Sequence, residues 1–127
     1  MYNKKMPIDL SCGMKVALEV IGGKWKSYII LAITEGSKRP SEIHKRIPET
    51  SPRVIDQQIK ELLDYGVLSR TVFNTISKHT EYDLTDFGKT LLPVINSLKE
   101  WGDKYTSKIK EAIQNKNNLY PHTDKIK

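Results

Sequence analysis

Apolar residues recur at helical spacing through the first half of the chain and predict a series of short helices. The first predicted helix begins at Met14 and ends at Gly22-Gly23, because paired glycines favour a break. The second covers residues 24–34, and Gly36 stands just past its end, where a glycine is favoured. These short helices indicate a chain that is mainly α in its first half.

The next strong helical pattern, residues 51–65, has two very different faces and follows a short predicted helix at residues 40–47. Ser51 is a good N-cap and Pro52 suits the first helical position, so the start of this helix is well marked. Its apolar face carries Ile55, Ile59, Leu62 and Leu63. Its opposite, polar face carries Arg53, Gln57 and Lys60.

The hydrophobic period then changes from helical to alternating. Residues 67–73 and 80–84 predict two strands, joined as a β-hairpin by the polar loop 74–79. We expect Thr85 to cap one long last helix, after which Asn and Lys dominate from Gln114 onward. This last helix carries the longest apolar stripe of the chain, formed by Leu91, Leu92, Ile95, Leu98, Trp101, Tyr105 and Ile109.

Length and composition fit one folded domain. The chain has 127 residues and is 38% hydrophobic, which suffices for a core. We expect the domain to cover residues 12–114, with flexible segments at residues 1–11 and 115–127. No apolar run approaches the roughly 20 residues that cross a bilayer, and we expect no secretory signal before the domain. We therefore predict a cytoplasmic protein without a membrane partner.

The chain is basic, and this changes what its elements predict. Lys and Arg number 21 against 15 Asp and Glu, giving a net charge of +6 with His neutral. Helix, turn, helix and hairpin on a basic chain predict an α+β, mainly α, winged helix-turn-helix that binds double-stranded DNA. The helix over residues 51–65 would enter the major groove, where Arg can bind guanine and Gln can bind adenine.

The predicted DNA contacts come from this helix and from the hairpin. They are Ser51, Pro52, Arg53, Gln57, Lys60, Arg70, Lys78 and His79. The alternative for each is a solvated surface residue, and for Arg70 we favour an ion pair with Glu81 across the hairpin over a phosphate contact. The long apolar stripe leads us to expect a homodimer contact through the last helix, against the alternative that this helix packs on its own domain. The residues expected to form this homodimer contact are Leu98, Trp101, Tyr105 and Ile109.

Ordered motifs from Cys12 to Tyr105 resemble the HxlR-type transcriptional regulators, a branch of the MarR-like winged-helix proteins. The matching segments are Cys12-Gly13 with Val20-Ile21-Gly22-Gly23-Lys24-Trp25-Lys26, Gln58-Ile59-Lys60-Glu61-Leu62 with Gly66, Glu81-Tyr82-Asp83-Leu84-Thr85 with Gly88, and Leu92-Pro93-Val94-Ile95 with Trp101-Gly102. The resemblance implies a homodimer held by the first and last helices, which binds a pseudo-palindromic operator as a repressor. The chain departs from the family at Gly13, Pro40 and Ser77-Lys78, where the family commonly has proline, an aromatic residue and Pro-Pro.

Cys12 aligns with a family cysteine that often senses oxidants, quinones or other electrophiles. The resemblance therefore implies a sensor role, which Lys15 and the helix N-terminus would favour by stabilising the thiolate. The alternative is an inert cysteine buried against the dimer partner. With one cysteine in the chain, an internal disulfide is excluded, which leaves an intersubunit disulfide, a mixed disulfide or an adduct. A small-molecule inducer site lined by Trp25, Tyr28 and Trp101 is the weaker hypothesis, since such aromatics are more often core.

Other classes of protein find little support. The three histidines, His44, His79 and His122, lack metal-ligand spacing, and no glycine-rich phosphate loop is present. We therefore expect no catalytic residue, no metal and no cofactor. The remaining rival is a winged-helix module that binds DNA without sequence preference or binds another protein.

Overall fold

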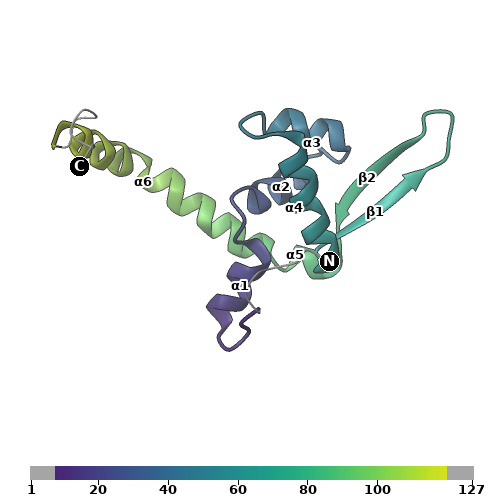
Figure 1. Ribbon diagram of the computed structural model, residues 1–127, viewed down its shortest axis with the longest axis horizontal. Coiled ribbons are helices and arrows are strands. Elements are labelled where there is room, and N and C mark those ends of the chain that lie inside the picture. Colours follow the sequence, from purple (N-terminus) through teal and green to yellow (C-terminus); the bar gives the residue numbers. More distant parts are fainter. Residues whose placement is uncertain (1–7, 120–127) are drawn as a thin grey trace. The chain divides into compact units, whose positions relative to one another are not determined.

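The computed structural model describes residues 8–119 of the chain, and Figure 1 shows its elements. In chain order they are α1 (Gly13–Ile21), α2 (Lys26–Thr34), α3 (Pro40–Arg46), α4 (Pro52–Asp64), β1 (Leu68–Phe73), β2 (His79–Leu84), α5 (Asp86–Lys89) and α6 (Leu92–Leu119). The chain divides between Leu92 and Pro93 into two compact units. The end segments predicted at residues 1–11 and 115–127 lie partly outside the described residues.

The core of the first unit is made by the apolar faces of α2, α3 and α4 together with the start of β1. Its largest fully buried side chains are Ile29, Ile30, Ile33, Ile43, Ile47, Ile55, Leu62 and Val67. Burial of these side chains is the main stabilising contribution to the unit. The helix α3, the turn after it and α4 form a helix-turn-helix, and the β1–β2 hairpin that follows is its wing (Figure 1). The predicted α+β, mainly α, winged helix-turn-helix is confirmed.

Both ends of α4 form as their sequence predicts. The Ser51 hydroxyl oxygen accepts a hydrogen bond from the Val54 backbone N–H at 3.3 Å, and Pro52 occupies the first helical position. At the other end the chain turns at Gly66, whose φ is 76°, a conformation that costs a glycine little. The backbone then enters β1 two residues later, so the helix and the wing are joined by a short, well-defined turn.

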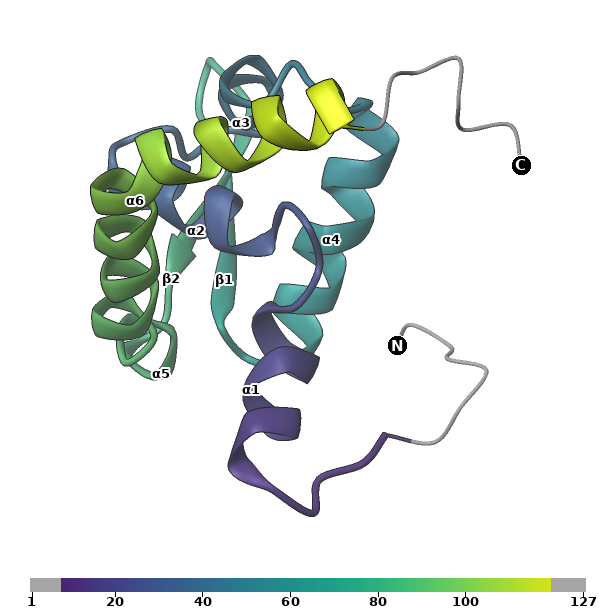
Figure 2. The ribbon, with the colours of Figure 1, turned by 90° about the vertical axis from the view of Figure 1, so that its left-hand side faces the viewer.

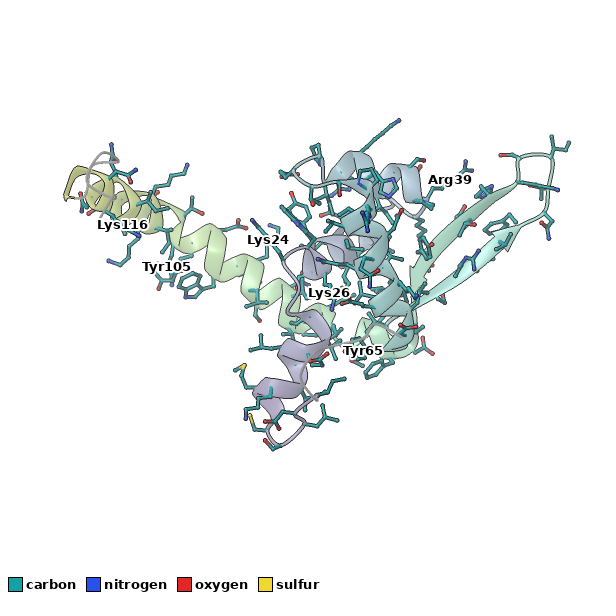
Figure 3. All side chains as sticks on the ribbon, in the orientation of Figure 1. Lys24, Lys26, Arg39, Tyr65, Tyr105 and Lys116 are labelled. Carbon is teal, nitrogen blue, oxygen red and sulfur yellow. The ribbon has the colours of Figure 1, made fainter. Side chains whose placement is uncertain are left out.

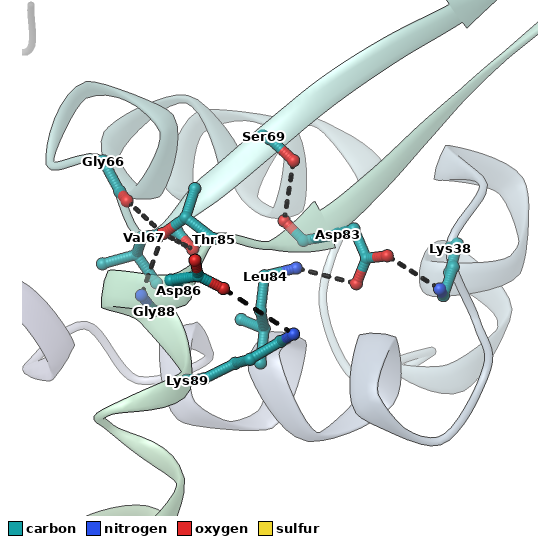
Figure 4. Close-up of polar contacts among 10 residues, drawn as sticks. All are labelled: Lys38, Gly66, Val67, Ser69, Asp83, Leu84, Thr85, Asp86, Gly88 and Lys89. Atoms are coloured by element: carbon teal, nitrogen blue, oxygen red, sulfur yellow. Dashed lines mark hydrogen bonds and ion pairs between the residues drawn. The ribbon is translucent and has the colours of Figure 1, made fainter.

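The wing is an antiparallel hairpin that is tied to the helices at its base. Its register pairs Leu68 with Leu84 and Phe73 with His79. The Tyr82 backbone N–H donates to the Lys38 carbonyl oxygen at 2.8 Å, which connects β2 to the segment between α2 and α3. The Lys38 ammonium lies 2.9 Å from the Asp83 carboxylate, and this contact holds the pKa of Asp83 below its usual value (Figure 4).

Thr85 and Gly88 fasten the end of the wing to its beginning. The Thr85 hydroxyl donates to the Gly66 carbonyl at 2.6 Å and accepts from the Gly88 N–H at 2.9 Å, so one side chain caps α5 and binds the turn before β1 (Figure 4). A Cβ added at Gly88 would lie 2.1 Å from the Val67 carbonyl oxygen, so only glycine fits there. This explains why a Thr-x-x-Gly sequence follows the second strand.

The prediction of a single long helix after Thr85 is wrong, because α5 and α6 are separate helices. Pro93 supplies the physical reason. In one continuous helix its missing N–H would leave the Lys89 carbonyl without its helical partner, and its ring would clash with that carbonyl. The chain instead turns at Thr90 and Leu91 and begins α6 at Leu92. At its other end α6 continues through Leu119, beyond the expected end at Gln114.

The described part of the second unit, residues 93–119, is the rest of α6, which bends at Tyr105 (Figure 2). Tyr105 has φ −108° and ψ 15°, outside the helical region. Near it, the Thr106 hydroxyl donates to the Gly102 carbonyl at 2.6 Å, a back-bond that bends helices. Among the described helices, including α6, none is both long enough and apolar enough to cross a membrane.

Candidate nucleic-acid interface

Helix α4 presents a polar outer face on which three predicted DNA contacts lie together. Arg53, Gln57 and Lys60 are exposed, and helical spacing places them opposite the buried Ile55 and Ile59. An α-helix fits the major groove of B-DNA, where guanidinium and amide groups can each make two hydrogen bonds to a base edge. The outer face of α4 therefore has the size and the chemistry needed for base reading.

The N-terminus of α4 carries the predicted contacts Ser51 and Pro52, both of which are exposed. The Ser51 oxygen is occupied as the acceptor of the N-cap bond, while its own hydroxyl proton can be donated to another acceptor. Pro52 has no N–H to donate. A helix N-terminus attracts anions, so this end of α4 suits a phosphate better than a base.

A buried ion pair lies beside the outer face of α4. The Lys26 ammonium at the start of α2 is 2.6 Å from the Glu61 carboxylate of α4, and both side chains are buried. The second Glu61 oxygen accepts a hydrogen bond from the Gln57 side-chain amide at 3.3 Å. The Lys26 ammonium also lies 5.8 Å from the centre of the Tyr65 ring, and Figure 3 labels both residues. The predicted base-reading residue Gln57 is thus connected to a buried lysine.

A further contact fixes the same side of α4 to the start of α2. The Gln58 side-chain oxygen accepts a hydrogen bond from the Trp25 backbone N–H at 3.1 Å. Gly23 lies so close that an added Cβ would be 3.2 Å from both the Gln58 oxygen and the Lys26 Cε atom. Two of the motif segments, residues 20–26 and residues 58–62, therefore meet in space and hold each other.

Sequence reasoning did not identify Lys26, Gln58 and Glu61 as parts of this interface. A signal was present, because Lys26 stands at helical spacing from Ile29, Ile30 and Ile33, on a face that is otherwise apolar. A charged side chain at such a position needs a partner of opposite charge. What the pattern alone does not supply is the identity of that partner, Glu61, which is distant in sequence.

Tyr65, at the end of α4, connects the helix to α1. Its hydroxyl donates to the Glu19 carboxylate. Burial, together with this carboxylate, raises the pKa of Tyr65 to about 12. The phenol is therefore neutral and acts as a hydrogen-bond donor throughout the physiological pH range.

The two helices of the helix-turn-helix are joined by a polar contact on their outer side. The His44 Nε2 atom of α3 lies 2.8 Å from the Asp56 carboxylate of α4. The start of α3 is held by Glu42, whose carboxylate accepts from the Arg39 and Lys38 backbone N–H groups, and the bond from Arg39 lowers the pKa of Glu42 most. Side-chain contacts thus support α4 from α2 and from α3.

The wing carries the predicted cation Lys78 on its exposed tip, whereas the His79 side chain is half-buried and bound to its neighbours in the hairpin. The His79 ring stacks on Phe73 with ring centres 4.8 Å apart, and its nitrogens lie 2.6 Å from the Ser77 carbonyl oxygen and 2.9 Å from the Glu81 carboxylate. Both of these neighbours are acceptors. Lys78 is therefore the freer of the two for contact with a phosphate.

The prediction of an ion pair between Arg70 and Glu81 is wrong. The register places Arg70 opposite Tyr82 and Glu81 opposite Thr71, so the two charged side chains lie on different faces of the hairpin. The Glu81 carboxylate is bound by His79 instead. The exposed Arg70 thus keeps only the other predicted role, a phosphate contact from the first strand of the wing.

Cys12 lies at the N-cap of α1 with an exposed side chain. The Lys15 ammonium, expected to favour its thiolate, is bound to the Asp9 carboxylate at 2.7 Å. That contact lowers the pKa of Asp9 to about 2. Among the described residues no cluster of His, Cys, Asp and Glu has the arrangement of a metal site, and His122 lies outside them.

A groove of about 1000 Å³ runs beside α4 in the first unit. Its walls include Leu18 and Gly22 on one side and Val54 and Gln57 on the other. The residues expected to form an inducer site, Trp25, Tyr28 and Trp101, do not line it. Because Gln57 lies on the outer face of α4, the groove adjoins that face. It gives no support to the aromatic site.

Apolar side chains are exposed on both helices that were expected to form a dimer contact. On α6 they include three of the four predicted contact residues, Leu98, Trp101 and Ile109, while Tyr105 is half-buried with its ring 5.2 Å from that of Trp101. On α1, Met14 is 68% exposed and Leu18 is 57% exposed. Exposed apolar patches of this kind mark interaction surfaces.

Comparison with known proteins gives a consistent result. The HxlR-like helix-turn-helix family profile matches residues 20–110. The HTH-type transcriptional regulator YdeP of Bacillus subtilis (strain 168), itself uncharacterized, is 39% identical over 115 residues, which is 86% of this chain and 90% of YdeP. The redox regulator HypR in its reduced form is 33% identical, with a TM-score of 0.73 over 79% of this chain and 99% of HypR.

A second solved structure is the reduced form of the transcriptional regulator YodB from B. subtilis. It is 29% identical, with a TM-score of 0.65 over 76% of this chain and 95% of YodB. YodB has also been solved after diamide treatment. The matched residues include the helix-turn-helix and the wing, and the family consists of transcriptional regulators rather than enzymes. The chain belongs to the HxlR-like helix-turn-helix family of DNA-binding transcriptional regulators.

Proposed function

We propose that this regulator binds a pseudo-palindromic operator sequence-specifically as a homodimer and acts as a repressor. The observation that carries the proposal is the outer face of α4, where Arg53, Gln57 and Lys60 are exposed together on a helix that is capped and held on two sides. In each protomer α4 would read bases in the major groove. Lys78 and Arg70 of the wing would bind phosphate or enter the adjacent minor groove.

The homodimer would form through α1 and α6. The exposed apolar residues of these helices support this role, because a soluble protein rarely leaves such surfaces uncovered. A two-fold dimer presents two copies of α4, and the symmetry of the protein then matches the symmetry of a palindromic site. The regulator would act in the cytoplasm, where its DNA is found.

Modification of Cys12 would switch the regulator. The thiol is exposed, HypR is a redox regulator, and YodB has been solved in reduced and diamide-treated forms. Diamide would take two electrons and two protons from two Cys12 thiols, one from each protomer, and leave an intersubunit disulfide. A quinone would instead add to one thiolate. Either product lies at the start of α1, so it would change the dimer contact and the spacing of the two α4 helices.

The test is a titration of the purified protein against the DNA that flanks its own gene, with excess competitor DNA. We expect operator binding to exceed non-specific binding by about 10³ or more at physiological salt. Diamide should abolish this preference in the wild type and leave it in Cys12→Ser. Equal binding of operator and competitor would favour the alternative, a module that binds DNA without sequence preference. No binding of either DNA would favour a protein-interaction module.

A further inference from the structure

The Lys26–Glu61 pair calls for an explanation other than stability. Removing two charged groups from water costs free energy that their mutual attraction often fails to return, and apolar residues of similar size frequently replace such a pair without loss. Here both side chains are buried, and the ammonium and carboxylate are 2.6 Å apart. The neighbours of the pair indicate another role for it.

The Glu61 oxygen that does not contact Lys26 contacts a residue on the outer face of α4. One Glu61 oxygen binds Lys26, and the other accepts a hydrogen bond from the Gln57 amide nitrogen at 3.3 Å. Gln57 is one helical turn before Glu61, and its side chain is exposed. One hydrogen bond thus connects the buried Glu61 carboxylate to an exposed side chain of α4.

This bond determines which way the Gln57 amide faces. A carboxylate accepts hydrogen bonds and repels the amide oxygen, so the NH₂ end must lie toward Glu61 and the oxygen away from it. The amide nitrogen carries two N–H bonds, so one is left for a base when the other binds Glu61. An oxygen and an N–H side by side are the groups with which a glutamine binds the two edge atoms of adenine.

We propose that the buried Lys26–Glu61 pair is a positioning device that holds the Gln57 amide in one orientation for base reading. Lys26 holds the Glu61 carboxylate in place through their contact at 2.6 Å, and Glu61 orients Gln57 before DNA arrives. Orientation in the free protein reduces the rotamer entropy that binding would otherwise lose. The proposal rests on the proposed function, because it explains how one residue of that interface gains its specificity.

The test removes the charges and keeps the packing. In Lys26→Met/Glu61→Leu the net charge is unchanged, so the electrostatic attraction to DNA is preserved. The matched control, Lys38→Met/Asp83→Leu, also removes one ion pair without changing the net charge, but at an exposed place away from α4. Thermal unfolding of each variant reports the fold, and binding to operators altered at each base pair reports the base preference.

We expect the core double variant to unfold at the wild-type temperature or above, yet to lose discrimination at the base pair that Gln57 reads. The loss should be about tenfold, equal to that of Gln57→Ala, and adding Gln57→Ala should cause no further loss. The control pair should keep the preference. Retained discrimination in a folded core variant, with Gln57→Ala still costing about tenfold in that background, would overturn the proposal.

A measurement on the wild type keeps the proposal testable if the core variant does not fold. Hydrogen exchange of the side-chain amides should be at least about tenfold slower for one Gln57 proton than for the exposed Gln114 of α6. Equal exchange would refute the positioning role. If the wild type shows no operator preference but Gln57 is protected, the proposed function fails while the contact stands.

Discussion

Helix α4 and the wing belong to one winged helix-turn-helix, yet they are held in different ways. Side chains from α2 and α3 contact α4 along its length, through Lys26 and through His44. The wing is tied to the helices at its base, where Tyr82 binds Lys38, and its tip is exposed. The difference suits two tasks: base reading needs side chains in fixed positions, whereas phosphate contact tolerates variation.

The largest effect should follow from breaking the buried support of α4. Glu61→Leu leaves the Lys26 ammonium buried without its partner, and such a change costs about 3–5 kcal/mol of unfolding free energy. Chemical denaturation of the single variant should show this loss, and the added Lys26→Met change should recover it. A single variant as stable as the wild type would show that Lys26 escapes to water.

A similar loss is expected at the base of the wing. In Gly88→Ala the new methyl group would lie 2.1 Å from the Val67 carbonyl oxygen, so α5 or β1 must move, at a cost of about 2–3 kcal/mol. The control is Gly102→Ala, where no atom lies within 4 Å and alanine favours the helix. Thermal unfolding that ranks the two variants in the opposite order would contradict this packing.

The base-reading role of α4 should appear next. Arg53→Ala and Gln57→Ala should each weaken operator binding by about 1–3 kcal/mol and weaken binding to random DNA much less. Arg53→Ala should hardly change the unfolding temperature, because Arg53 is exposed, whereas Gln57→Ala also removes the hydrogen bond to the buried Glu61 and should lower it slightly. Competition titrations measure both affinities, and an equal loss on both DNAs would assign these residues to phosphate contacts.

A change in the wing should affect the affinity for all DNA and leave the base preference unchanged. Lys78→Ala should weaken binding to all DNA about equally and reduce the slope of log affinity against log salt by about 1. Titrations at several salt concentrations give that slope for operator and competitor. A change of base preference in Lys78→Ala would remove the distinction between the two regions.

The smallest effect concerns the exposed contact at the base of the wing. The Lys38 ammonium holds the pKa of Asp83 below its usual value. The ionised carboxylate therefore stabilises the fold fully at pH values above that usual pKa. The contribution is therefore lost as pH falls through the lowered pKa. Between about pH 6 and pH 3 the wild type should lose slightly more stability than Asp83→Asn. Parallel pH profiles would show that the contact adds nothing measurable, as is common for exposed pairs.

Much of the fold is predictable from local sequence signals. Ser51-Pro52 and Gly66 mark the ends of α4, and alternation marks the wing, because caps, turns and periodicity depend on neighbouring residues. The split of the last helix was also signalled locally, by Pro93, although it was not predicted. The exposed positions of Arg53, Gln57 and Lys60 follow from the same periodicity.

The contacts between distant residues are what the pattern does not contain. Lys26 and Glu61 are separated by most of the helix-turn-helix, and nothing local pairs them. The incorrect Arg70–Glu81 pair has the same origin, since the strand register decides which face each residue occupies. Register and tertiary pairing depend on the whole fold, so they became clear only in three dimensions.

The measurement that tests the central claim most directly is selection of preferred sequences from a randomised operator library by the wild type, Gln57→Ala and Lys78→Ala. We predict that the wild type selects a two-fold symmetric site and that Gln57→Ala loses its preference at matching positions in both half-sites. Lys78→Ala should select the same site as the wild type, with lower affinity. Identical selection by the wild type and Gln57→Ala, or no selection by the wild type, would contradict the assignment of base reading to α4.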